Sequence, residues 1–216
     1  MPSKKIKTQV LPDKYYHIYN RANNNELVFK DHDDFQFFML KLGEVVTDKI
    51  DIFCFCLMPN HFHLLIKPKS EVRRKGKGSI NESLKSLFQF YAQYFNKKYH
   101  RKGSLFYKPF RRIEITNDSY LKYLMFYIHY NPQKKNLVKH YSDYQYSSYR
   151  FFLLNKETKL RKDIVLEWFD NDLNDFKAFH EDCLERICGI GTPAQGLESP
   201  GMESLFFLSL AKSKFT

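Results

Sequence analysis

Apolar and polar residues alternate in the first patterned segment of the chain and then recur at helical spacing. Residues 15–21, YYHIYNR, alternate aromatic and polar side chains and predict a strand, which the turn-rich ANNNE ends. From Asp31, a residue type that caps helices, apolar side chains follow one helix face to about Asp48. The pattern therefore begins with a strand and a helix.

Two apolar runs of strand length come next, with two residues between them. Residues 50–58, IDIFCFCLM, lead through Pro59 and Asn60 into residues 61–68, HFHLLIKP. Such a short connection predicts a hairpin. Because the first run is apolar at nearly every position, we expect both faces of the sheet to be covered. The cover is either the C-terminal segment or a second subunit.

A helix, a short strand and a third helix complete the pattern. Ser79, three residues before a glutamate, predicts the start of a helix over about 80–99. Residues 112–115 alternate like an exposed edge strand. The segment 117–119 supplies residues that start helices, and we expect the helix that follows to stop at Asn131-Pro132, because proline disfavours continuation.

The order strand, helix, strand, strand, helix, strand predicts an α+β fold, a ferredoxin-like antiparallel sheet (βαββαβ) with helices on one face. In that topology the third strand lies between the first and second, so the start of HFHLLIKP is expected beside the end of the first strand. We expect this domain to span residues 1–155. A C-terminal helical extension over 156–188 and a flexible tail over 189–216 follow it.

Composition adds a strong basic charge to this picture. The 216 residues include 35 Lys and Arg against 24 Asp and Glu, a formal charge of +11, so the surface field favours a polyanion. A generically basic protein is the alternative. The cysteine pairs lack zinc-ligand spacing, and no apolar stretch has the length of a membrane span. We therefore predict a cytoplasmic protein without a membrane partner.

Two pairs of residues have the spacing of a catalytic site. His61 and His63 are two apart on a predicted strand, so both imidazoles project from one face within reach of one cation. Short His-x-His pairs arise by chance, and two ordinary histidines are the alternative. Tyr127 and Asn131 are four apart and hence neighbours on a helix face. Spacing alone does not single out Tyr127 among 15 tyrosines.

Basic side chains surround these elements and suit a groove for a single strand or a hairpin, in which cations bind phosphates and aromatic rings stack on bases. A solvated basic face is the alternative for about half of them. The loop that begins at Arg73 is the first candidate. The predicted DNA-binding residues are Arg21, Arg73, Arg74, Lys75, Lys77, Arg111 and Arg112.

The motifs MPNHFHLLI, YIHYNPQKKNLV and DYQYSSY resemble those of the insertion-sequence-200-like and REP-associated tyrosine transposases, members of the HUH single-tyrosine group. The resemblance covers about residues 14–152. It implies that His61 and His63 bind a divalent metal, Mg²⁺ or Mn²⁺. It also implies that Tyr127 is the nucleophile and that Asn131 takes the place of a third ligand. Relatives commonly have glutamine there, and asparagine is one methylene shorter.

The resemblance further implies a DNA transposase that cuts and rejoins single-stranded DNA at hairpin-forming ends. Its tyrosine would form a covalent 5′-phosphotyrosine and free a 3′-OH while the metal offsets phosphate charge. Single-stranded DNA or DNA hairpins are the expected partners, and relatives include homodimers as well as monomers. The alternatives are a non-catalytic, domesticated protein that binds DNA or RNA hairpins, and a metal-dependent hydrolase in which Tyr127 is structural.

Overall fold

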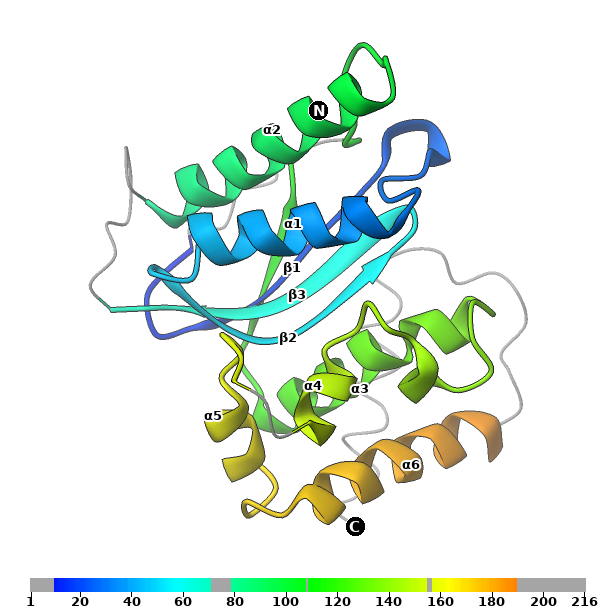
Figure 1. Ribbon diagram of the computed structural model, residues 1–216. Helices are drawn as coiled ribbons and strands as arrows, with labels where there is room; N and C mark the ends of the chain where they lie inside the picture. Colours follow the sequence, from blue (N-terminus) through cyan, green and yellow to red (C-terminus); the bar gives the residue numbers. More distant parts are fainter. Residues whose placement is uncertain (1–9, 71–78, 108, 155–156, 190–216) are drawn as a thin grey trace, which may run out of the picture.

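Four strands form one antiparallel sheet with helices on both faces (Figure 1). This arrangement comes from a computed structural model, which describes residues 10–70, 79–107, 109–154 and 157–189. The predicted α+β class and ferredoxin-like topology are confirmed.

The sheet has the strand order β2-β3-β1-β4, and every neighbouring pair is antiparallel. Arg21 at the end of β1 lies opposite His61 at the start of β3, as the predicted topology requires. Pro59 and Asn60 form the tight turn between β2 and β3. The strands are β1 (Tyr15–Arg21), β2 (Ile50–Met58), β3 (His61–Pro68) and β4 (Arg111–Ile115).

Helices α1 (His32–Val45) and α2 (Ile80–Lys98) pack on one face of the sheet. Asp31 caps α1 through its side chain, and the Ser79 side chain accepts a hydrogen bond from the third residue of α2. Apolar side chains of both helices, such as Phe38, fill the first core against the inward residues of β1, β2 and β3. These are the two helices of the βαββαβ unit, and they lie on one face as predicted.

Helix α3 (Asp118–Lys134) packs on the opposite face and does not stop at Asn131-Pro132, so that prediction is wrong. Pro132 lacks only its own N–H, and it lies in the last turn, where little helix remains to be disrupted. Helical hydrogen bonding resumes at once, because the Lys135 N–H donates to the Asn131 carbonyl at 3.0 Å. Both Asn131 and Pro132 are buried, and this packing holds the proline inside the helix.

The C-terminal segment, rather than a second subunit, covers this second face (Figure 1). The Phe176 ring stacks on Tyr149 and contacts Phe152 at a tilt, and the three rings share the second core with residues of β2 and α3. The segment 146–148 also hydrogen-bonds along the outer edge of β2. The remaining elements are 3₁₀ helices Asn23–Asn25 and Tyr141–Asp143, and helices α4 (Tyr149–Leu153), α5 (Lys162–Glu167) and α6 (Leu173–Gly189). Beyond Gly189, the predicted tail lies outside the described residues.

The second core contains His180 of α6, which is fully buried. Burial lowers its pKa from an ordinary 6.5 to about 4. Between these two pH values His180 is protonated in the unfolded chain but neutral in the folded protein. The free energy of unfolding therefore falls as the pH drops through this window. We expect His180→Gln to reduce that slope by up to about 1.4 kcal/mol per pH unit. Urea unfolding of the metal-free protein from pH 7 to pH about 4 measures it. An unchanged slope would contradict the prediction, and Phe169→Leu is the control for destabilisation without loss of a titrating group.

Candidate active site

His61 and His63 project from the same face of β3, the face on which α3 packs. Their ring centroids lie 5.1 Å apart, with the ring planes perpendicular. In the sheet His63 is opposite Tyr19 on one side and Cys56 on the other. His63 is only 8% exposed, whereas His61 is half-buried at the edge of the site. The predicted common face of the two imidazoles is therefore present.

Each imidazole is held by a hydrogen bond at its Nδ1 atom. The carboxamide oxygen of Asn60 accepts from His61 Nδ1 at 2.6 Å, which leaves the lone pair on His61 Nε2. His63 Nδ1 lies 2.8 Å from His17 Nε2, and when His63 donates this bond its own Nε2 has the lone pair. Partners of this kind orient metal-binding histidines and fix their tautomer.

The sequence analysis did not select His17 or Asn60, although both could have been found. Asn60 directly precedes His61 in the predicted turn. His17 is two residues before Tyr19, the residue opposite His63, so strand alternation places it on the same face. Only the register of β1 against β3, which the fold supplies, shows that the two rings meet.

Both candidate ligands are neutral near pH 7. Burial, followed by the nearby charge of Lys135, lowers the pKa of His61 to about 4. Burial lowers the pKa of His63 well below its ordinary value, and His17, His61 and Lys134 act in the same direction. A neutral imidazole offers a nitrogen lone pair to a metal, whereas an imidazolium does not.

Tyr127 comes from α3 and its ring meets His63 edge to face, with centroids 6.2 Å apart. The ammonium of Lys134, two turns further along the helix, lies 5.0 Å from the Tyr127 ring centroid. Asn131 is buried one turn after Tyr127, and its Nδ2 donates to the Tyr127 main-chain carbonyl at 3.0 Å. The fold thus brings Tyr127 to the histidines and sets Asn131 beside it on the same helix.

The donor atoms at this place suit a divalent cation. Within the described residues no group of three His, Cys, Asp or Glu side chains could hold a metal, so a site here needs a different third ligand. The Asn131 amide nitrogen already bonds to the main chain, and its oxygen is the atom left to face a cation. Two neutral imidazoles and one carboxamide oxygen are a nitrogen and oxygen donor set that could hold a divalent cation.

Two of the predicted DNA-binding arginines lie on the histidine face or at its edge. Arg21 is opposite His61, and its guanidinium covers the ring of Tyr107 at 4.7 Å. Tyr107 is 42% exposed and was not selected from the sequence. Arg111 is opposite Tyr19, which in turn is opposite His63, so alternation places Arg111 on the same face as the histidine.

Arg112 points to the other face of the sheet. It is opposite Ile18, a residue of the first core, and its guanidinium donates to the Asn81 carboxamide oxygen of α2 at 2.5 Å. This contact turns Arg112 away from the histidines. The predicted contacts Arg73, Arg74, Lys75 and Lys77 lie outside the described residues.

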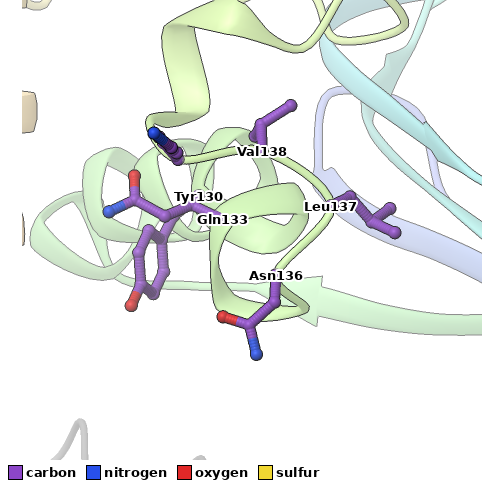
Figure 2. A pocket seen from close by; sticks show the side chains of 6 residues that line it. Tyr130, Gln133, Asn136, Leu137 and Val138 are labelled. Carbon is purple, nitrogen blue, oxygen red and sulfur yellow. The ribbon is translucent and has the colours of Figure 1, made fainter.

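A pocket at the C-terminal end of α3 is a separate feature (Figure 2). The pocket is not lined by His61, His63, Tyr127 or Asn131. The pocket is therefore not the candidate active site. Its lining residues are Tyr130, Gln133, Asn136, Leu137, Val138 and Lys139.

Comparison with known proteins identifies the family. The family model described as IS200-like transposase matches residues 11–131, more than half of the chain. The chain belongs to the IS200-like transposase family. This match confirms the resemblance of the motifs, and it gives the protein the role of a DNA transposase. The matched residues include β1 to β4, α1, α2 and α3 as far as Asn131.

One of two similar solved structures supports the fold. A REP-associated tyrosine transposase bound to a REP hairpin aligns with 16% identity and a TM-score of 0.57, over 70% of this chain and 85% of that one. A candidate transposase from Deinococcus radiodurans R1 aligns with 16% identity and a TM-score of 0.37, over 53% of this chain and 88% of that one. No curated protein matches the sequence. Among the described residues, no helix is long and apolar enough to cross a membrane.

Proposed function

We propose that this transposase cuts and rejoins single-stranded DNA at hairpin-forming ends through a covalent 5′-phosphotyrosine at Tyr127. A divalent metal, Mg²⁺ or Mn²⁺, is bound by His61 and His63, with Asn131 as third ligand. The observation that supports this best is the contact between Tyr127 and His63, whose rings come from elements 64 residues apart in sequence. Resemblance of motifs alone does not require that contact.

The residues have distinct roles in the proposed reaction. The Tyr127 hydroxyl oxygen attacks the scissile phosphorus, the bond from phosphorus to the 3′ oxygen breaks, and the phenolic proton is lost while the leaving oxygen gains one. The metal supplies charge neutralisation and alignment of the phosphate. Lys134 and Lys135, both exposed beside the histidines, add positive charge where the phosphate enters. Rejoining reverses these steps, so no nucleoside triphosphate is consumed.

A DNA hairpin is the proposed partner. The solved REP-associated transposase is bound to a REP hairpin, and its fold resembles this one. Here the basic residues Arg21, Lys134, Lys135 and Arg111 surround the histidine face. Cations bind phosphates, and the exposed ring of Tyr107 offers a surface for base stacking.

The decisive experiment is a search for the covalent adduct. Protein, Mn²⁺ and a hairpin oligonucleotide with a single-stranded flank are incubated, with the label placed either 5′ or 3′ of the cut. We expect a denaturation-resistant protein adduct only with the 3′ label, and none in the presence of EDTA. Hairpin binding without any cleavage would favour the non-catalytic alternative. Products derived from water without an adduct would favour the hydrolase.

The two neighbouring arginines of β4 provide a matched test of the DNA path. Arg111 lies on the histidine face and Arg112 on the α2 face. We expect Arg111→Gln to weaken hairpin binding. The magnitude of the slope of the logarithm of the binding constant against the logarithm of salt concentration should fall by about one. Arg112→Gln removes the same charge and should have a much smaller effect on both the hairpin affinity and its salt dependence. Fluorescence anisotropy at several salt concentrations measures both, and equal losses would contradict the proposed path.

A further inference from the structure

Two buried histidines outside the candidate site connect α3 to α6. His129 lies two residues after Tyr127 and two before Asn131, and His180 belongs to α6. Both are fully buried, and His129 Nδ1 lies 2.9 Å from His180 Nε2. Neither residue has a role in the proposed chemistry.

The donor and the acceptor of each hydrogen bond around this pair can be assigned. His180 Nδ1 must donate to the Phe176 carbonyl at 2.8 Å, because a carbonyl only accepts, so His180 Nε2 is an acceptor. His129 Nδ1 therefore donates to His180, and its own Nε2 accepts from the Ser148 hydroxyl at 2.8 Å. The Phe55 carbonyl, at 3.1 Å, is the more distant acceptor for the same hydroxyl proton and already accepts from the Ser148 backbone N–H. Ser148 Oγ in turn accepts from the Phe55 N–H of β2 at 2.8 Å. Each ring nitrogen and the hydroxyl of the His180-His129-Ser148 network thus has a hydrogen-bond partner.

The network joins the helix that bears Tyr127 to the sheet that bears the histidines. Ser148 is bonded to the main chain of Phe55 through both its backbone N–H and its hydroxyl. In the sheet, β2 is the direct neighbour of β3. The apolar contacts of α3 with the second core are non-directional and permit small rotations and shifts of the helix. Directional hydrogen bonds to a buried ring on α3 resist such movement.

We propose that the His180-His129-Ser148 network is a positioning device that holds Tyr127 at its distance from His63. The inference rests on the proposed function and extends it, because it makes the C-terminal helix α6 a working part of the active site. His180, which contacts neither Tyr127 nor the candidate ligands in any described interaction, acts through His129. A shift of the attacking oxygen by about 1 Å is sufficient to slow a reaction of this kind about a hundredfold.

Three variants separate positioning from general stability. His180→Leu removes the acceptor for His129 and leaves a buried N–H unpaired. His180→Gln restores a side-chain oxygen that can accept the same bond. Phe169→Leu is the matched control, because Phe169 is buried in the same core and packs on Phe176 of α6 without a hydrogen bond to the network. Thermal unfolding shows how far each variant is destabilised.

The first measurement is the single-turnover rate of adduct formation at saturating hairpin and Mn²⁺. We expect His180→Leu to slow it by about tenfold or more at unchanged hairpin affinity, with substantial recovery in His180→Gln and the wild-type rate in Phe169→Leu. A wild-type rate in His180→Leu would overturn the inference. An equal loss in Phe169→Leu at equal destabilisation would also overturn it, since stability alone would then explain the effect.

The second measurement is hydrogen exchange of the α3 backbone from Tyr127 to Lys134 in the absence of DNA. Exchange should be faster by about tenfold in His180→Leu than in Phe169→Leu, and His180→Gln should be protected like the wild type. This readout is independent of catalysis. If the wild type forms no adduct, the proposed function fails, whereas unchanged exchange in His180→Leu overturns the network itself.

Discussion

Replacing Tyr127 with phenylalanine should abolish formation of the covalent DNA adduct, with a loss of cleavage on the order of 10³-fold or more. The substitution removes only the hydroxyl oxygen, and the ring that meets His63 and Lys134 remains. Packing of α3 should therefore be nearly unchanged. The loss follows because no other described atom takes the place of that oxygen as the attacking group in the proposed reaction.

Tyr130→Phe is the control for this prediction. Tyr130 is on the same helix, is partly buried, and stacks on Phe126 at 5.4 Å, outside the candidate site. Its variant loses the same atom from α3 and should form adduct at the wild-type rate. Hairpin binding by Tyr127→Phe should stay within about twofold of the wild type, because a phosphodiester is positioned by cations and base contacts. An adduct undiminished in Tyr127→Phe would refute the assignment of the nucleophile.

Elements with strong periodicity could be predicted from the sequence. The hairpin around Pro59 and Asn60 follows from two apolar runs separated by two residues, and the side-chain period of a strand puts His61 and His63 on one face. The topology then places His61 opposite Arg21, as observed. These inferences succeed because each depends on local geometry or on a short list of permitted connections.

The end of α3 could not be predicted in this way. The rule that proline stops a helix concerns local sterics and one missing hydrogen bond. It gives no weight to the burial of Asn131 and Pro132, which only the tertiary structure shows. The helix consequently continues for two residues beyond Pro132 to Lys134, the residue whose ammonium lies over Tyr127. A helix that ended at Asn131 would not place Lys134 over the Tyr127 ring, so the helix end bears directly on the candidate site.

The contacts that assemble the site lie beyond sequence spacing for the same reason. His17 meets His63 across 46 residues, and His129 meets His180 across 51 residues, with no periodic pattern connecting either pair. The role of residues after 155 is likewise absent from the pattern, because aromatic rings such as Phe169 and Phe176 fill the second core only when α3 is in place. The resemblance of the motifs predicts the roles of Tyr127 and Asn131, and the fold shows which neighbours surround them.

Removal of the His61 imidazole should reduce both metal affinity and cleavage, each by a factor on the order of 10² or more. Asn60→Ala provides an intermediate case. It keeps the candidate ligand and removes only the oxygen that accepts from His61 Nδ1 at 2.6 Å, so the ring loses its fixed tautomer and orientation. We expect Mn²⁺ to bind Asn60→Ala about tenfold more weakly than the wild type, and raised Mn²⁺ to restore its cleavage.

Two measurements distinguish this prediction from general damage to the fold. Mn²⁺ binding is followed by electron paramagnetic resonance without DNA, and adduct formation is followed over a range of Mn²⁺ concentrations. His32→Ala is the control, because His32 is exposed at the start of α1 and bonds to Tyr146. It should bind Mn²⁺ and cut like the wild type. Raised Mn²⁺ should rescue Asn60→Ala but not Tyr127→Phe, since only the first defect lies in metal affinity. Equal Mn²⁺ binding by the wild type and His61→Ala would remove His61 from the ligand set.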